Sequence, residues 1–264
     1  MITISQLNIY PIKSAKGISL TSSIIEERGF QFDRRWMLID EKGNFLTQRQ
    51  HSKLALITVE IVSDGLSVSA PSMEKLVIPF YGDKKKYCKV QIWNDTVQAL
   101  RLNTVIDEWF STFLHAQCYC VFMPDESQRL VDTTYAHNKE HTSFADGFPF
   151  LLISEASLQY LNTKLSEPIL MNRFRPNIVV SDCTPFEEDA WKTIKIGNTI
   201  FDCVKPCARC TITTINQETG EKGKEPLKTL AQFRTMNGKI LFGQNLLHKN
   251  FGTIHIGNIV EILK

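Results

Sequence analysis

Short apolar runs separated by polar turn residues fill the first hundred positions, and this alternation is typical of β-strands. The run Ile2–Tyr10 ends at a proline, and the run Trp36–Asp40 ends at a Glu-Lys-Gly-Asn turn. Two further pairs of runs each enclose a short turn, so they predict β-hairpins over residues 56–70 and 88–100. The N-terminal part of the chain is therefore predicted to be rich in β-strands.

Helical periodicity begins where this hairpin pattern stops. Apolar residues recur at helical spacing from Val105 to Leu114, and Asn103 precedes them as a suitable N-cap. Ser154 is a suitable N-cap for a second helix, which we expect to run from Glu155 to about Leu165. Apolar runs predict strands at 118–123 and 150–153, and the polar stretch between them predicts a long functional loop at 124–149.

Two segments near the C-terminus, Thr193–Val204 and Thr253–Leu263, each turn at Ile-Gly-Asn. Glycine as the first turn residue suits a type II′ turn, so both segments predict hairpins, and closely spaced strands predict a barrel or sandwich. The fold class is therefore predicted to be α+β and mostly β. We expect an N-terminal β-rich domain, residues 1–120, followed by a β-barrel domain with a few flanking helices, residues 121–264.

Composition and charge narrow the classes of partner. The 264 residues carry a formal net charge of +2, which gives no general reason to bind nucleic acid or an anionic membrane. The local run Asp83–Lys86 is expected to be a solvated loop. No apolar stretch approaches the ~20 residues that span a bilayer, and no secretory signal is visible. The protein is therefore expected to be cytoplasmic, without a membrane partner.

Seven cysteines, an odd number, argue against a disulfide framework in such a protein. Two of them, Cys207 and Cys210, lie two residues apart in Lys-Pro-Cys-Ala-Arg-Cys. Four interpretations stay open at this point: a structural zinc site, a redox dithiol, an iron–sulfur site, or one thiolate on a soft metal whose other ligands come from a cofactor. The β-favouring residues that follow do not suit a thioredoxin-type dithiol, which opens a helix.

Basic residues next to predicted strands are the second chemical feature. Lys13 and Ser14 follow the first strand, Arg34 precedes another, and Arg175 precedes the apolar run at 178–180. Strand ends with arginine are good platforms for phosphate. The alternative is ordinary surface cations, or a salt bridge such as Asp33 with Arg35. His137 and His141 do not form an H-E-x-x-H motif, so a hydrolytic zinc site is not expected.

Several segments, in their order along the chain, resemble the MOSC N-terminal domain and the MOSC domain of bacterial and mitochondrial amidoxime-reducing proteins. The N-terminal set is YPIKSAKG (10–17), FDRRWMLID (32–40), GNFLTQRQ (43–50) and KLALI (53–57). The C-terminal set is FADGFPFLLISEASL (144–158), NRFRPNIVV (172–180), KPCARCTITTINQETGE (205–221) and FGQNL (242–246).

That family binds the pterin-based molybdenum cofactor, so the resemblance implies residue roles. Cys210 is the expected molybdenum ligand, and Asp146 matches an acid near the metal. Gly147 and Phe148 replace hydroxyl side chains of the mitochondrial proteins, so backbone N–H groups would make their contacts. Four residues match those that hold the pterin and its phosphate: Lys13, Ser14, Arg34 and Arg175. Two weaker matches, Asn177 and Asn245, would line the same pocket.

The resemblance also implies an activity, the reduction of N-hydroxylated compounds from N–OH to N–H. No ferredoxin domain follows the last predicted strand, so the electrons are expected from a separate protein with flavin, haem or iron–sulfur chemistry. A second hypothesis is a non-catalytic module that binds or carries the cofactor. A third is a plain β-barrel protein with a zinc-bound or redox-active cysteine pair.

Overall fold

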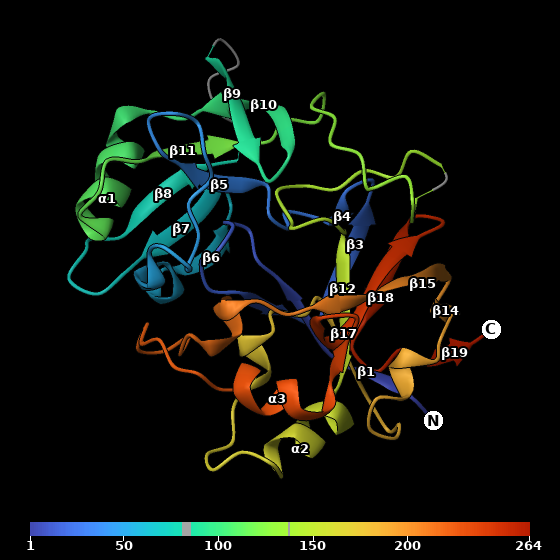
Figure 1. Cartoon of the computed structure of the whole chain (residues 1–264). Helices are drawn as coiled ribbons and strands as arrows, with labels where there is room; N and C mark the ends of the chain where they lie inside the picture. The colour runs from blue at the N-terminus through green and yellow to red at the C-terminus, as the bar shows by residue number, and fades with distance from the viewer. Residues whose placement is uncertain (81–85, 137) are drawn as a thin grey trace.

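The fold is that of a computed structural model, which describes residues 1–80, 86–136 and 138–264. His137, and residues 83–85 of the basic run for which a solvated loop was predicted, lie outside the described residues. Figure 1 shows two bodies side by side, with the first hundred residues divided between them.

The larger body is built on a mostly antiparallel sheet with the strand order β19-β14-β15-β17-β12-β13-β1-β2, to which β16 adds beside β17. A second sheet, β18-β3-β4, packs with it. The strands of the first sheet are β1 (Thr3–Ile9), β2 (Ile18–Leu20), β12 (Phe150–Ser154), β13 (Ile178–Ser181), β14 (Thr193–Ile196), β15 (Thr199–Ala208), β16 (Thr235–Met236), β17 (Lys239–His248) and β19 (Val260–Ile262); those of the second are β3 (Ser22–Glu26), β4 (Gly29–Phe30) and β18 (Gly252–His255).

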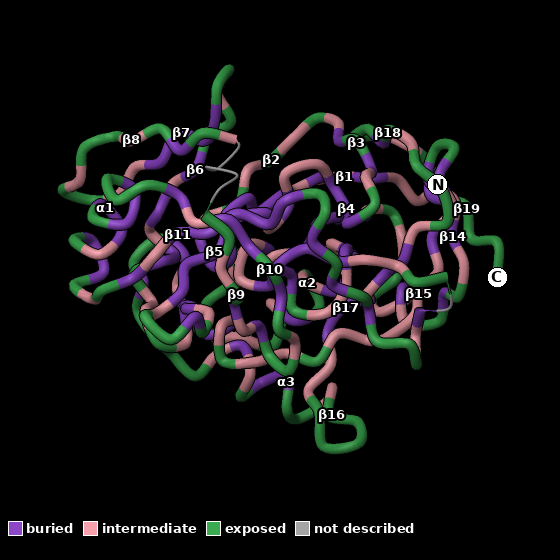
Figure 2. Tube along the Cα trace, turned by 90° about the horizontal axis from the view of Figure 1, so that it is seen from above, coloured by how far each residue is buried: buried purple, intermediate pink, exposed green. Residues whose placement is uncertain are grey.

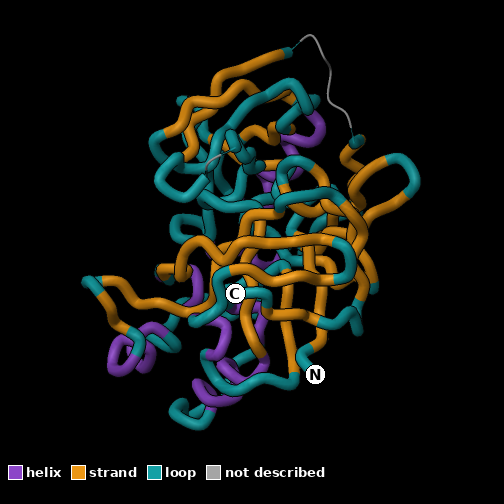
Figure 3. Tube along the Cα trace, turned by 90° about the vertical axis from the view of Figure 1, so that its right-hand side faces the viewer, coloured by secondary structure: helices purple, strands orange, loops and turns teal. Residues whose placement is uncertain are grey.

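The smaller body holds the sheets β5-β11-β10-β9 and β6-β7-β8, with helix α1 (Thr104–Leu114) packed against them. Two other helices, α2 (Glu155–Asn162) and α3 (Leu227–Phe233), lie at the lower edge of the larger body in Figure 1. Strands therefore dominate, and the helices stand at the periphery (Figure 3). The strands of this body are β5 (Trp36–Ile39), β6 (Thr58–Val62), β7 (Gly65–Ser69), β8 (Leu76–Pro79), β9 (Tyr87–Ile92), β10 (Asp95–Arg101) and β11 (Tyr119–Phe122).

Each body has its own apolar core. Trp36, Phe110 and Leu66 are fully buried in the smaller one, while Leu7 and Phe201 are fully buried between the sheets of the larger one. Figure 2 shows these buried segments running through the interior of both bodies. The prediction of a mostly β, α+β protein with an N-terminal β-rich region, a barrel-like region and a few flanking helices is confirmed. The division at residue 120 stays a prediction.

One of the two predicted C-terminal hairpins forms and the other does not. Strands β14 and β15 pair across the turn at Gly197, whose φ of +57° suits glycine. The segment Thr253–Leu263 is not a hairpin, because β18 pairs with β3 and β19 pairs with β14. Between them, Gly257 donates to the carbonyl of Ile4 and the Ile4 N–H donates to Asn258, so the chain crosses β1 and does not fold back.

Candidate functional site

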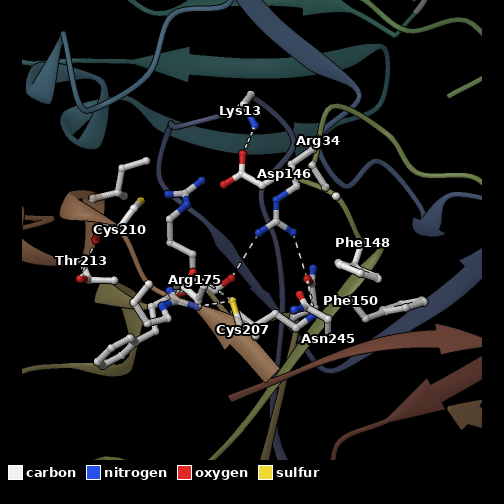
Figure 4. Close-up of a pocket in the computed structure, with 18 of the residues that line it drawn as sticks. Lys13, Arg34, Asp146, Phe148, Phe150, Arg175, Cys207, Cys210, Thr213 and Asn245 are labelled. Atoms are coloured by element: carbon white, nitrogen blue, oxygen red, sulfur yellow. Dashed lines mark hydrogen bonds and ion pairs between the residues drawn. The ribbon is translucent and has the colours of Figure 1, made fainter. Parts of the chain in front are cut away.

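A cleft between the two bodies gathers all ten residues that the sequence suggested for a cofactor site. Its empty space, including the part open to solvent, is about 800 Å³. The predicted residues that line it are Lys13, Ser14, Arg34, Asp146, Gly147, Phe148, Arg175, Asn177, Cys210 and Asn245, and Cys207 lines it with them. Figure 4 shows Lys13 facing Asp146, with Cys210 and Phe148 on opposite sides.

Three of these residues have a left-handed backbone. Ser14, Arg34 and Arg175 have φ values of +73°, +51° and +57°, a region that residues other than glycine rarely adopt. Each such residue costs of order 1 kcal/mol or more and persists only where the surroundings enforce it. Strain of this kind concentrates at functional sites, and here it turns three polar side chains toward one cleft.

Tyr10 organises the two arginines. Its ring contacts both guanidiniums, that of Arg175 at 4.2 Å from the ring centroid and that of Arg34 at 4.5 Å. The Tyr10 hydroxyl donates to the carbonyl of Pro176 at 3.0 Å, so the ring cannot swing away. Burial raises the pKa of Tyr10 to about 12, although both guanidiniums act in the opposite direction. Tyr10 therefore stays neutral and serves as the flat surface on which both cations rest.

The two arginines differ in what neutralises them. Arg34 donates to the buried carboxylate of Asp33 at 2.5 Å and to the amide oxygen of Asn177 at 3.0 Å. Arg175 donates to the carbonyl of Ala15 at 2.6 Å, and the described part of the chain offers it no carboxylate partner. Burial lowers the pKa of Arg175 to about 10, and the neighbouring charge of Arg34 adds to this. Arg175 is thus a half-buried cation that an anionic ligand would stabilise.

Lys13 and Asp146 form an ion pair of 2.6 Å at the mouth of the cleft. Burial lowers the pKa of Lys13 to about 8, against the opposing effect of Asp146. Burial would raise the pKa of Asp146, but the charge and hydrogen bond of Lys13 outweigh it and hold that pKa well below its usual range. The Asp146 side chain is 61% accessible, so the ion pair, more than burial, sets its charge.

The two cysteines of the motif have separate surroundings. Cys207 accepts a hydrogen bond from Nη1 of Arg209 at 3.0 Å, whereas Cys210 lies 3.7 Å from Nη1 of Arg49. Both thiols are free, and a single turn of 3-10 helix, Thr211–Thr214, begins directly after Cys210. Within the described residues, no three His, Cys, Asp or Glu side chains cluster as metal ligands. The zinc interpretation therefore finds no further protein ligands there.

The two asparagines contribute unequally. Asn177 is buried, and its amide accepts from Arg34 and donates to the carbonyl of Asn8, so it joins β1 to β13 and positions Arg34. Asn245 donates to the carbonyl of Lys205 across the β15–β17 pair. The suggested salt bridge of Asp33 with Arg35 is absent from the described ion pairs, in which Asp33 pairs with Arg34 and Arg35 with Asp125.

Sequence reasoning missed four residues of this site: Tyr10, Arg49, Trp93 and Arg209. Arg209 donates to the carbonyl of Phe174, and its buried Nε has no partner among the described residues. Tyr10 and Arg49 stand inside segments already noted, but neither is next to a charged or nucleophilic group in sequence. Trp93 carried a signal that could have been used, because a tryptophan is unusual at a hairpin turn.

The cleft can hold a multiply charged anion and a soft metal at the same time. Guanidinium groups suit phosphate oxygens, and a thiolate suits a transition metal. No helix among the described residues is long and apolar enough to cross a bilayer.

Comparison with known proteins agrees with this geometry. Residues 1–117 match the model of the MOSC N-terminal beta barrel domain, and residues 139–261 match that of the MOSC domain. Mitochondrial amidoxime-reducing component 1 of Mus musculus is 34% identical over 99% of this chain and 82% of its own length. Mitochondrial amidoxime reducing component 2 of Rattus norvegicus is 33% identical over 98% and 82%, and component 1 of Homo sapiens is 32% identical over 99% and 83%. The chain therefore belongs to the MOSC family, in the group that joins a MOSC N-terminal beta barrel domain to a MOSC domain.

Proposed function

We propose that this protein is a molybdenum-cofactor-dependent reductase of N-hydroxylated compounds. The observation that carries the proposal is the meeting, in one cleft, of a free thiol at Cys210 with Lys13, Arg34 and Arg175. The names of the relatives, which are amidoxime-reducing components, support the same chemistry.

The residues present fit the pterin-based molybdenum cofactor. Its phosphate is an anion of nearly two charges, and Arg175 is a half-buried guanidinium without a carboxylate partner among the described residues. Arg209 adds a second such guanidinium, whose buried Nε is unpaired there. Cys210 would supply one thiolate to the metal, which is a suitable donor for a soft site whose other ligands come from the cofactor.

The reaction consumes two electrons and two protons: R–NH–OH + 2 e⁻ + 2 H⁺ gives R–NH₂ + H₂O. When bound, the cofactor would accept the oxygen and transfer the electrons, and the protein would bind and orient the substrate. Lys13 and Asp146 stand at the mouth of the cleft, where they can hold a polar N–OH group and pass a proton. We propose that a separate flavin, haem or iron–sulfur protein provides the electrons and that the protein works in the cytoplasm.

The test begins with protein made in a host that supplies the cofactor. Molybdenum per chain is measured by elemental analysis, and benzamidoxime reduction is followed with a chemical reductant. We expect about one molybdenum per chain and formation of benzamidine, and the same preparation from a cofactor-deficient host should show neither.

Two outcomes would contradict the proposal in different ways. Stoichiometric molybdenum without reduction of any N-hydroxylated compound would make the protein a cofactor-binding or carrier module. Stoichiometric zinc without molybdenum would return the cysteine pair to a structural role.

A further inference from the structure

A tryptophan and an arginine stand over the cleft beside Cys210. The guanidinium of Arg49 lies 4.6 Å from the ring centroid of Trp93, and its Nη1 is 3.7 Å from the Cys210 sulfur. Trp93 in turn donates from Nε1 to Asp146 at 3.3 Å. The pair therefore bridges from the thiol on one side of the cleft to the acid at its mouth.

Trp93 occupies a costly backbone position. It is the first of the two turn residues between β9 and β10, and its φ is +53°. Such turns favour glycine, asparagine or aspartate where φ is positive, and a bulky side chain there is strained. The indole is also 45% exposed, so burial of the ring does not explain its presence. A strained and exposed aromatic beside a reactive cleft is typical of a ligand contact.

Arg49 is held in place by its contacts, and its charge acts on Asp146 only through space, where it helps to lower the pKa of that carboxyl. Its guanidinium rests on Trp93 and lies 5.9 Å from the ring centroid of Phe45, and its carbonyl accepts from Lys222 at 2.9 Å. Among the described residues no carboxylate pairs with it, while Asp146 is already paired with Lys13. The charge of Arg49 is therefore available to a ligand.

We propose that Trp93 and Arg49 form the substrate-selecting wall of the cleft, a role that rests on the proposed reductase function. The indole stacks on a flat, conjugated substrate, and the guanidinium pairs with an anionic group at its far end. The preferred substrate class is then a planar aromatic N-hydroxylated compound that is neutral or negatively charged. A positively charged substituent at the same place meets repulsion from Arg49.

The experiment compares three amidoximes that differ in one feature each. The first, 4-carboxybenzamidoxime, has an anionic group, and the second, 4-(aminomethyl)benzamidoxime, has a cationic group. The third, acetamidoxime, has no aromatic ring. We expect KM to be at least fivefold lower for the carboxylate than for the aminomethyl compound. Arg49→Gln should bring these two KM values within twofold, and Trp93→Leu should reduce the preference for ring compounds over acetamidoxime at least fivefold.

Binding without turnover gives an independent readout. The cofactor-loaded protein is titrated with 4-carboxybenzamidoxime in the absence of reductant, and the quenching of tryptophan fluorescence is followed. Trp36, Trp109 and Trp191 are buried, so the exposed Trp93 should dominate the quenching. Trp93→Phe should remove most of the fluorescence change, and Arg49→Gln should raise Kd at least fivefold.

Lys89→Gln is the matched control, because Lys89 is an exposed cation on the same hairpin as Trp93. Arg49 contacts Cys210 and Trp93 contacts Asp146, both of which line the cleft, whereas no such side-chain contact is described for Lys89. The control variant should leave Kd and every KM unchanged. An unchanged Kd in Arg49→Gln and an unchanged preference for ring compounds in Trp93→Leu, with turnover intact, would overturn this inference alone, as would loss of molybdenum in both variants. If the wild-type protein binds 4-carboxybenzamidoxime through Trp93 and Arg49 but reduces no amidoxime, the proposed function is wrong, whereas the role of these two residues in binding is kept.

Discussion

Cys207 and Cys210 are close in sequence but interact with different arginines, so their loss should have different effects. Cys210→Ala is expected to lower molybdenum per chain and benzamidoxime reduction at least tenfold, because it removes the sulfur beside Arg49 that we propose as the metal ligand. Cys207→Ala should keep more than half of both, because Cys207 packs into an apolar cluster and accepts from Arg209. Elemental analysis and initial rates measure the two effects, and equal losses would indicate a paired-cysteine site.

Lys13 should make anion binding depend on pH. Because its pKa is lowered to about 8, the side chain loses its charge in the empty cleft as the pH rises through that value. A bound anion favours the protonated form, so the affinity for sulfate, which does not titrate in this range, should fall between about pH 7 and pH 9. Isothermal titration of cofactor-free protein checks this, and Lys13→Met should flatten the dependence. If the affinity of the wild-type protein for sulfate did not change over that pH range, the assignment would be contradicted.

Some residues of the site have roles that can be predicted from the sequence, and others do not. Lys13, Arg34, Arg175 and Cys210 have functional groups whose chemistry is apparent from residue type, and all four line the cleft. Tyr10 is a different case, because its importance lies in a ring that contacts two arginines from segments about 140 residues apart. No local pattern encodes that contact.

At the scale of elements, helix α1 tests whether its N-cap, Asn103, stabilises the helix as the sequence predicts. Asn103 accepts a hydrogen bond from the Ile106 N–H at 3.0 Å, as its N-cap position predicted. Asn103→Ala should lower the free energy of unfolding by about 1 kcal/mol, because one N-terminal N–H loses its acceptor. Urea unfolding measures this loss, and the neighbouring exposed Thr104→Ala is the control. No change relative to that control would show that another group caps the helix.

Strand pairing was less predictable than helix N-termini, for a physical reason. A cap or a two-residue turn depends on neighbours in sequence, and both N-caps and the hairpin at Gly197 were predicted correctly. The partner of an isolated strand depends on which apolar surface remains uncovered. Ile254 is buried against the cluster that contains Ile25, so β18 pairs with β3 although its sequence resembles half of a hairpin. The second helix likewise ends at Asn162, earlier than predicted.

At the scale of the whole molecule, the two sequence regions share one sheet. Strand β1 lies between β13 and β2, and β3 pairs with β18 from the far end of the chain. Side chains of both regions fill one apolar cluster, including Ile4, Leu7 and Phe30 with Phe150 and Phe201. The predicted boundary at residue 120 can therefore be tested by asking whether the second region is self-sufficient.

A fragment of residues 121–264 should not fold alone. Without β1, β3 and β4 the fragment exposes the apolar faces of β13 and β18. Each lost contact of a buried leucine- or isoleucine-sized side chain costs about 2 to 5 kcal/mol, so the loss of several exceeds the stability of an ordinary domain. Circular dichroism during heating should show no cooperative transition, whereas the mixture with residues 1–120 should regain one. A cooperative transition in the fragment alone would refute this expectation.

The cleft draws its walls from residue 10 to residue 245, and this spacing orders events during biosynthesis. Tyr10 is made early, whereas the strand that carries Asn245 is made more than two hundred residues later. A chain that stops before this strand cannot present the complete site. The cofactor that we propose for this cleft would therefore bind only after that strand is in place, and its supply would limit the active fraction without limiting the amount of folded chain.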